Sequence, residues 1–319
     1  MTGHLYVTRQ LTDDAMASVA ALGVPVVVGE ERPPTTAELL RDAAGAVAIV
    51  STLTDRVDAA VLDAAGAGLQ VVANVAVGYD NVDVEAARAR GVVVTNTPGV
   101  LDGATADLTL GLVLAAARRI AEGDRFLRTG TPWVWGPRML VGLDLSAGAT
   151  LGIVGYGRIG RAVARRARAF DMRVLATPTR SGLTPAERDA VEFRELPDLL
   201  ASADVVTLHC PLTPQTQHLI DAAALARMRP TALLVNTARG GIVDTDALVA
   251  ALTAGRLAGA ALDVFEDEPR VDPRLPALPQ VVLTPHLGSA GGATRSAMCG
   301  LAVRNVAAVL AGSPPLTPV

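Results

Sequence analysis

A glycine-rich turn in the middle of the chain constrains the fold more than any other feature of the 319 residues. The turn Gly155–Gly160 (GYGRIG) follows a short apolar run, Leu151–Val154, and precedes a helix-like stretch, Arg161–Phe170. In such a strand–turn–helix unit the first glycine permits the tight turn, the second admits a ligand close to the backbone, and the third lets the helix pack on the strand. Because free N–H groups at the start of a helix bind phosphate, this order predicts a dinucleotide site.

Two series of short apolar runs alternate with helix-like segments along the chain. The first series is Leu5–Thr8, Val24–Val28, Val47–Ser51, Val71–Val75 and Val92–Thr95, and the second is Leu151–Val154, Val174–Ala176, Val205–Leu208, Ala232–Val235, Gly259–Leu262 and Val281–Leu283. Uninterrupted apolar strands between helices indicate parallel sheets covered on both faces. We therefore expect an α/β fold of two doubly wound parallel-sheet (Rossmann-like) domains, with the active site in the cleft between them.

Two long helix-like stretches set the expected domain boundaries. Ala104–Ala121 has apolar residues at helical spacing and is expected to join the two series of runs. The last stretch, Ala290–Ala311, is too long for a simple tail, so we expect it to return to the first domain. The sequence thus predicts a first domain of residues 1–99 with 288–319, and a dinucleotide-binding domain of residues 100–287.

Charge and composition disfavour several classes of protein. The 28 basic and 32 acidic residues leave a net charge of −4, and no run of like charges can follow a phosphate backbone, so a nucleic-acid partner is disfavoured. The chain has neither the segment order of a secretory signal nor an uncharged apolar run of about 18 residues, which favours a cytoplasmic protein without membrane contact. Cys210 and Cys299 have no CxxC spacing, so neither a disulfide framework nor a metal site is expected.

The residues after the second strand of the dinucleotide-binding unit bear on which nucleotide binds. NAD-binding versions of this unit place Asp or Glu there to hold the ribose hydroxyls. This chain has no carboxylate in that region, whereas Thr179, Arg180 and Ser181 can receive a 2′-phosphate, with Arg180 offering a charge-assisted fork. The sequence therefore favours NADP(H). NAD(H) is the alternative if Arg180 is only a solvated surface residue.

Three polar segments that follow apolar runs of the second series carry candidate catalytic residues. They are Val235–Gly241, Leu262–Pro269 and Thr284–Ser289. Because ligands of open α/β sheets bind at the carboxyl ends of the strands, we expect Arg239, Glu268 and His286 to come together. An arginine can hold a carboxylate and polarise a keto oxygen, a histidine can donate the proton, and a neighbouring carboxylate favours the protonated imidazole. This set suits hydride reduction of a 2-keto acid.

Two other acids compete with Glu268 for the place beside His286. Glu266 and Asp267 lie in the same segment, and the register favours Glu268.

Taken together, the motifs resemble those of the D-isomer-specific 2-hydroxyacid dehydrogenases, particularly the glyoxylate/hydroxypyruvate reductase branch. The motifs that carry the resemblance are Val75–Asp83, Thr97–Gly99, Ala104–Asp107, Gly155–Gly160, His209–Thr213, Asn236–Gly240, Asp263–Pro269 and Pro285–Ser289. The resemblance implies that the first domain binds substrate. It also implies NAD(P)H-dependent reduction of glyoxylate, hydroxypyruvate or a similar acid to the D-2-hydroxy acid, with Arg239, Glu268 and His286 as the catalytic set.

The resemblance also implies ligand-binding residues beyond the catalytic set. Backbone N–H groups at Val77 and Gly78 are expected to hold the substrate carboxylate, and Asp263 to contact the nicotinamide carboxamide. Trp135 resembles an aromatic residue that reaches the active site of a neighbouring subunit, which suggests a homodimer. Together with Thr179, Arg180 and Ser181, the expected nucleotide-binding residues are Thr105, Gly155, Gly157, Arg158, Ile159, Gly160, His209, Cys210, Pro211, Thr237, Ala238, Arg239, Asp263, His286 and Gly288.

Other activities fit the same motifs. Corepressors of the C-terminal-binding-protein type share them but act as NAD(H)-responsive binding proteins, and related dehydrogenases act on phosphite, D-lactate or phosphoglycerate. Gly291 and Gly292 replace bulkier residues that are common after His286, so the sequence leaves the local substrate preference open.

Overall fold

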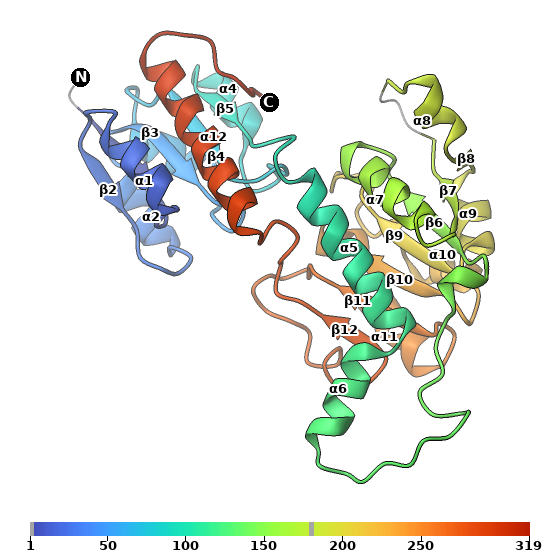
Figure 1. Ribbon diagram of the computed structural model, residues 1–319. Coiled ribbons are helices and arrows are strands. Elements are labelled where there is room, and N and C mark those ends of the chain that lie inside the picture. The colour runs from blue at the N-terminus through green and yellow to red at the C-terminus, as the bar shows by residue number, and fades with distance from the viewer. Residues whose placement is uncertain (1–2, 179–181) are drawn as a thin grey trace. The chain divides into compact units, whose positions relative to one another are not determined.

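The computed structural model describes residues 3–178 and 182–319, which form two compact units (Figure 1). Unit 1 comprises Met1–Leu101 with Ala290–Val319, and unit 2 comprises Asp102–Ser289. Each unit has its own parallel sheet, so the expected class of two parallel-sheet α/β domains is confirmed. The last helix, α12 (Gly292–Leu310), belongs to unit 1.

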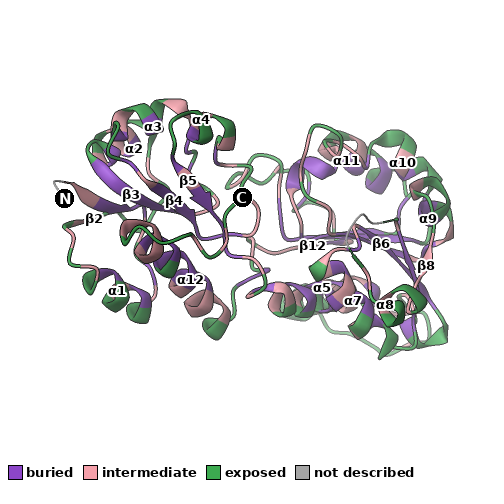
Figure 2. Ribbon diagram, turned by 90° about the horizontal axis from the view of Figure 1, so that it is seen from above, coloured by how far each residue is buried: buried purple, intermediate pink, exposed green. Residues whose placement is uncertain are grey.

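Unit 1 is built on a five-stranded sheet with the order β2-β1-β3-β4-β5, all parallel. The strands are β1 (His4–Val7), β2 (Val26–Val28), β3 (Ala46–Ser51), β4 (Val71–Asn74) and β5 (Val93–Thr95). The other helices are α1 (Asp13–Ala20), α2 (Thr36–Ala43), α3 (Ala59–Ala65) and α4 (Val84–Ala89). Figure 2 shows α1 and α12 on one face of this sheet and α2, α3 and α4 on the other, which leaves the central strands β3 and β4 fully buried.

Unit 2 has a seven-stranded sheet with the order β12-β11-β10-β9-β6-β7-β8, again all parallel. Its strands are β6 (Thr150–Val154), β7 (Arg173–Ala176), β8 (Glu192–Phe193), β9 (Val205–Leu208), β10 (Leu233–Asn236), β11 (Gly259–Leu262) and β12 (Val281–Leu283). Its helices are α5 (Asp102–Ala117), α6 (Ile120–Arg128), α7 (Arg158–Arg168), α8 (Pro185–Asp189), α9 (Leu196–Ser202), α10 (Ala222–Arg227) and α11 (Thr245–Thr253). Helices α5 and α7 cover one face, and α9, α10 and α11 cover the other (Figure 2).

Local sequence explains where several helices begin. Asp58, Asp221 and Asp244 each accept a backbone N–H in the first turn of α3, α10 and α11. Thr35 and Thr184 form capping boxes with a glutamate three residues later at the start of α2 and α8. Such caps satisfy N–H groups that have no partner within the helix, which fixes the first residue of each helix.

The strand order of unit 2 defines where a ligand binds. From β6 the chain continues outward through β7 and β8, then returns to β9 on the other side of β6. The connections therefore diverge between β6 and β9, and the carboxyl edge at such a point is the usual ligand site of an open α/β sheet. The segments after β6, β9, β10, β11 and β12 all leave from this edge.

Two expectations about elements were wrong in detail. The short edge strand β8 is a seventh strand, which the sequence did not reveal because it has two half-buried residues. The stretch Ala104–Ala121 is not one helix, because α5 ends at Ala117 and Arg119 adopts a left-handed conformation, φ 51°, before α6 begins. That conformation turns the chain and separates the two helices.

Residues 3–178 and 182–319 contain neither a membrane-spanning helix nor a cluster of metal-binding side chains. No helix there has the length and hydrophobicity needed to span a membrane. In the same ranges no group of His, Cys, Asp and Glu side chains could hold a metal ion.

Candidate active site

A histidine–glutamate pair lies at the carboxyl edge of the unit 2 sheet. Nδ1 of His286, after β12, lies 2.8 Å from Oε2 of Glu268, after β11. A carboxylate only accepts hydrogen bonds, so Nδ1 carries the proton in this bond and Nε2 is the nitrogen left to exchange a proton with a ligand. The backbone N–H of Phe265 donates to Oε1 of Glu268 at 2.9 Å, so both carboxylate oxygens of Glu268 accept a hydrogen bond.

The charge state of Glu268 follows from its neighbours. Burial raises the pKa of Glu268, but the hydrogen bond and charge of His286, the Phe265 N–H and the charge of Arg239 together outweigh burial and lower it. The carboxylate is therefore ionised at neutral pH. Glu268 therefore presents a negative charge to Nδ1 of His286.

The two competing acids point elsewhere. Glu266 lies 2.6 Å from Nε2 of His218, and its other oxygen accepts the Thr245 hydroxyl at 3.1 Å. Asp267 forms an ion pair with Arg270. The structure thus places Glu268, and neither of its two neighbours, against His286.

The turn that carries Arg239 is held by Asn236 and by close packing. The Asn236 amide donates to the Arg239 carbonyl at 2.8 Å, and its oxygen accepts the Ala238 N–H at 3.0 Å. A Cβ on Gly240 would overlap the backbone of Phe265, so the Arg239 turn lies directly against the turn that leads to Glu268. Asn236 was part of a sequence motif, but nothing in the sequence assigned it this positioning role.

Asp263 organises the turn that carries His286. Its Oδ1 accepts the Thr284 hydroxyl at 2.6 Å and the Leu287 N–H at 2.7 Å, and its Oδ2 accepts the Gly288 N–H at 2.8 Å. The His286 N–H also donates to the Asp263 carbonyl at 2.8 Å. His286 has a left-handed backbone, φ 53°, so these bonds stabilise a conformation that is unfavourable for a residue with a Cβ. Asp263 is therefore a positioning residue in this structure.

The glycine-rich turn has the shape needed to bind a pyrophosphate. Gly155 has φ 98°, and a Cβ there would lie 2.5 Å from the Cys210 nitrogen, while a Cβ on Gly160 would overlap the Gly155 carbonyl. A Cβ on Gly157, directly before α7, would meet nothing within 4 Å. The first and third glycines are thus required by the fold, whereas the second leaves space beside the free N–H groups of the helix.

The segment after β9 adds a polar atom without a partner. Nε2 of His209 is buried and has no hydrogen-bond partner among the described residues. Burial lowers the pKa of His209 to about 3 and raises that of Cys210 to about 11, so both side chains are neutral. This buried nitrogen beside the open glycine turn leaves a polar atom for a bound nucleotide to pair with, so these residues fit the expected cofactor.

The other residues that the sequence predicts to bind ligands are distributed over both units. A Cβ on Gly288 would lie 3.5 Å from the Thr105 side chain, and Thr237 shares a 2.9 Å hydroxyl–hydroxyl bond with Thr109 of α5. Arg158 and Ile159 open α7, and Pro211 and Ala238 lie in the loops that follow β9 and β10. Val77 and Gly78 belong to unit 1. Thr179, Arg180 and Ser181 lie outside the described residues.

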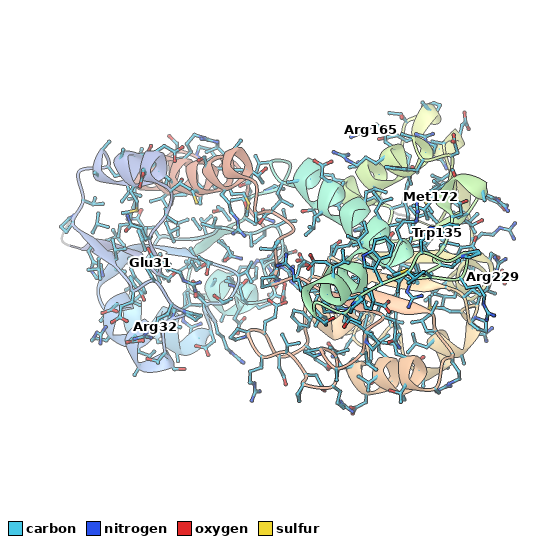
Figure 3. All side chains as sticks on the ribbon, turned by 60° about the horizontal axis from the view of Figure 1, so that its bottom comes forward. Glu31, Arg32, Trp135, Arg165, Met172 and Arg229 are labelled. Atoms are coloured by element: carbon cyan, nitrogen blue, oxygen red, sulfur yellow. The ribbon has the colours of Figure 1, made fainter. Side chains whose placement is uncertain are left out.

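The loop with the two tryptophans is exposed. Trp133, Val134 and Trp135 are 53%, 89% and 75% accessible, and Trp135 is labelled in Figure 3. Neither tryptophan belongs to the core of unit 2.

Replacing Gly157 by alanine tests the nucleotide site separately from the fold. We expect an unchanged melting temperature, because the new methyl group enters open space. We also expect at least about a tenfold weaker affinity for NADPH, because the methyl group lies where the pyrophosphate must approach the backbone. Titration calorimetry measures the affinity, and Gly68→Ala, which also points into open space in unit 1, is the control. Equal NADPH affinity in both variants would contradict the assignment.

Replacing Glu268 by glutamine tests the histidine–glutamate pair through its pH dependence. The amide keeps the size of the side chain but removes the negative charge that lies against Nδ1 of His286. Because our proposal has His286 transfer the proton while paired with Glu268, we expect kcat/KM for keto acid reduction to fall and its pH profile to differ from that of the wild type. A profile that overlays that of the wild type would refute the coupling.

The same pair affects acid stability. The lowered pKa of Glu268 means that its contribution to stability is present above its ordinary value of 4.5 and is lost as the pH falls through the folded-state value. The melting temperature of the wild type should therefore fall more steeply below that pH than the melting temperature of Glu268→Gln.

Comparison with known proteins identifies relatives of this chain. A family model for the D-isomer specific 2-hydroxyacid dehydrogenase, NAD binding domain, matches residues 110–288. A glyoxylate reductase of Thermococcus kodakarensis is 46% identical and covers 99% of this chain and 96% of its own length.

Solved structures of other proteins are also similar to this chain over nearly its whole length. The TT0316 protein of Thermus thermophilus is 50% identical, with a TM-score of 0.92 and 99% of each chain covered. An NADPH-dependent glyoxylate/hydroxypyruvate reductase of Sinorhizobium meliloti, solved with NADP and malonate, is 34% identical, with a TM-score of 0.84, covering 100% of this chain and 97% of its own.

Proposed function

This chain belongs to the D-isomer specific 2-hydroxyacid dehydrogenase family, and from that premise we propose that it reduces a small 2-keto acid such as glyoxylate or hydroxypyruvate to the D-2-hydroxy acid. The observation that carries the proposal is the Glu268–His286 pair at the carboxyl edge of a sheet that has an open glycine turn, with the Arg239 turn packed against the Phe265 backbone that leads to Glu268. The high identity to glyoxylate reductases supports the substrate class.

Each catalytic side chain has one task in the reaction. Arg239 binds the substrate carboxylate and polarises the keto oxygen. His286 donates its proton from Nε2 to that oxygen, because Glu268 already occupies Nδ1. Glu268 stabilises the imidazolium before transfer and fixes the ring. A bound nicotinamide nucleotide supplies the hydride for the carbonyl carbon.

The residues that would hold the ligands are those named from the sequence. Gly155–Gly160 and the start of α7 would bind the pyrophosphate, and His209–Pro211 would border the adenosine. Thr105, Thr237, Ala238, Asp263 and Gly288 would surround the nicotinamide end. The N–H groups of Val77 and Gly78 would hold the substrate carboxylate.

We also propose a preference for one nucleotide and a homodimeric assembly. We favour NADPH over NADH because the sequence has no carboxylate between Thr177 and Ser181 and has Arg180 there instead. A relative is described as NADPH-dependent, which supports this preference. The exposed Trp135 loop supports a homodimer in which Trp135 approaches the partner subunit's substrate, and we place the enzyme in the cytoplasm.

The test is a steady-state assay of nucleotide oxidation, followed by the near-ultraviolet absorbance of the reduced form. We expect rapid oxidation of NADPH with glyoxylate or hydroxypyruvate, and slower oxidation of NADH. If no 2-keto acid is reduced while the protein still binds nucleotide, the dehydrogenase assignment fails, and a nucleotide-responsive binding protein of the corepressor type becomes the better account.

A further inference from the structure

The last residues of the chain form an extra strand-like partner for β5 in unit 1. The Val319 N–H donates to the Val94 carbonyl at 3.1 Å, and the Asn96 N–H donates to the Thr317 carbonyl at 3.2 Å. Thr95 and Pro318 form an antiparallel bridge between these bonds. The segment Leu316–Val319, called the terminal segment below, therefore covers the open side of an edge strand in a fixed register.

Asn305 of α12 fixes that register from inside the unit. Its side chain is fully buried. Its Oδ1 accepts the N–H groups of Leu316 and Thr317 at 2.9 and 3.1 Å. Its Nδ2 donates to the Thr317 hydroxyl at 2.9 Å and to the Leu301 carbonyl at 3.0 Å. A buried amide with all four groups paired holds the terminal segment in one position.

Thr317 connects the terminal segment, through hydrogen bonds, to the loop Val77–Gly78, which the sequence predicts to bind the substrate carboxylate. Its hydroxyl donates to the Asn96 carbonyl at 2.6 Å. The side chain of Asn96, which is 8% exposed, donates in turn to the Val77 carbonyl at 2.7 Å. Asn305, Thr317 and Asn96 thus form a continuous hydrogen-bonded chain that ends on the loop Val77–Gly78.

The bond to the Val77 carbonyl sets the direction of a neighbouring donor. In a trans peptide the carbonyl of one residue and the N–H of the next point in opposite directions. Holding the Val77 carbonyl on the Asn96 side therefore aims the Gly78 N–H away from it. Within the part of the chain that the structure describes, neither the Val77 nor the Gly78 N–H has a hydrogen-bond partner.

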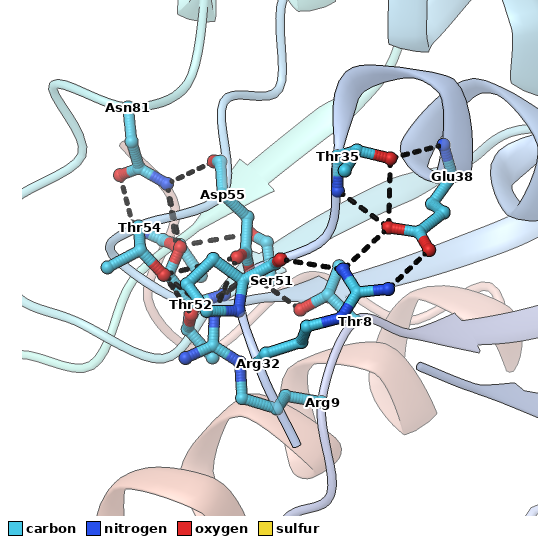
Figure 4. Close-up of polar contacts among 12 residues, drawn as sticks. Thr8, Arg9, Arg32, Thr35, Glu38, Ser51, Thr52, Thr54, Asp55 and Asn81 are labelled. Carbon is cyan, nitrogen blue, oxygen red and sulfur yellow. Dashed lines mark hydrogen bonds and ion pairs between the residues drawn. The ribbon is translucent and has the colours of Figure 1, made fainter. Parts of the chain in front are cut away.

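A second set of side-chain amide hydrogen bonds holds the same loop. Asn74, at the end of β4, donates to the Gly78 carbonyl at 3.0 Å and to the Asn81 oxygen at 3.0 Å. Asn81 itself donates to the carbonyls of Thr52 and Asp55 at 3.0 and 2.9 Å (Figure 4). Both carbonyls of the loop are thus fixed by buried amides, and its two N–H groups are left for a ligand.

We propose that the terminal segment is a positioning element for carboxylate binding, in which Thr317, acting through Asn96, sets the direction of the Gly78 N–H. The inference rests on the proposed function, because the carboxylate role of Val77 and Gly78 is part of it. Thr317 touches no ligand and acts through Asn96. Its loss should therefore weaken binding of the keto acid without changing the chemistry at His286.

Replacing Thr317 by valine tests the proposal. Valine has the shape of threonine but neither donates to Asn96 nor accepts from Asn305. We expect KM for glyoxylate to rise about tenfold, with kcat and the NADPH dissociation constant unchanged. Thr317→Ser, which keeps the hydroxyl, should restore the wild-type KM. Leu316→Ala removes an exposed side chain but keeps the N–H that Asn305 accepts, so it is the control and should leave KM unchanged.

The outcomes separate this inference from the proposed function. Absence of keto acid reduction by the wild type overturns the proposed function and the inference with it. With an active wild type, an unchanged KM in Thr317→Val overturns the inference alone. So does a parallel loss of kcat, nucleotide affinity and melting temperature, since that is the signature of general destabilisation. If Thr317→Val does not fold, Asn96→Ser replaces it, with the same expected rise in KM.

Discussion

Replacing His286 by glutamine is expected to lower kcat for keto acid reduction by about 10²–10⁴-fold, the usual contribution of a general acid. Glutamine still forms hydrogen bonds, but it has no proton to give at working pH. The affinity for NADPH should remain close to that of the wild type, because our proposal places the phosphates at Gly155–Gly160 and not on this side chain. Steady-state rates and calorimetric NADPH binding measure the two effects separately.

The matched control is another histidine bonded to a glutamate. His218 lies 2.6 Å from Glu266 in the same unit, and its hydrogen bond with Glu266 raises its pKa. His218→Gln should retain nearly all activity, because among the described residues no hydrogen bond or ion pair joins the His218–Glu266 pair to His286 or Glu268. A His286 variant that turns over as fast as the His218 variant would remove His286 from the mechanism.

Replacing Asp263 by asparagine is expected to have the second large effect. The carboxylate accepts bonds from Thr284, Leu287 and Gly288, and the side chain is buried. An asparagine has one oxygen, so in either orientation its amide nitrogen faces the N–H of Leu287 or Gly288. We expect a loss of stability of about 1–3 kcal/mol from the unsatisfied donor. We also expect about a 10²-fold lower kcat, because the turn no longer holds His286 in place.

A carboxylate at the other edge of the sheet separates the two effects. Asp204 accepts the Thr150 N–H at 2.8 Å at the amino end of β6 and also binds Arg229. Asp204→Asn should lower the melting temperature while leaving kcat near the wild-type value. If Asp263→Asn shows the same pattern as Asp204→Asn, Asp263 is structural only and does not position His286.

The parts of the fold that local sequence determines could be predicted. The order of strand, glycine turn and helix at Gly155–Gly160 is encoded within a few residues, and the inner strands β3, β4, β6, β9, β10 and β11 are fully buried runs. The sequence did not reveal the edge strand β8 or the left-handed conformation of Arg119, and the reasons differ. Two half-buried residues carry no periodic signal, and a break in an apolar helix at a residue other than glycine has no sequence signature.

The candidate site was predictable in its residues but not in its contacts. Arg239, Glu268 and His286 follow successive strands of one sheet, so their common edge follows from topology. The choice of Glu268 over Glu266 depends on which carboxylate faces His286, and the structure pairs Glu266 with His218 instead. The bonds of Asp263 and the contact of Thr317 with Asn96 join residues distant in sequence, 221 positions apart in the second case, so sequence patterns could not reveal them.

The most direct test of the proposed function is to follow the hydride itself. The wild-type enzyme is given glyoxylate or hydroxypyruvate with NADPH that carries deuterium at the transferring position of the nicotinamide, and the product is analysed by mass spectrometry and NMR. Our account predicts a 2-hydroxy acid with one deuterium on the carbon that was the keto carbon, formed as fast as NADPH is consumed. A product without deuterium, or no product from a protein that binds NADPH, would contradict it.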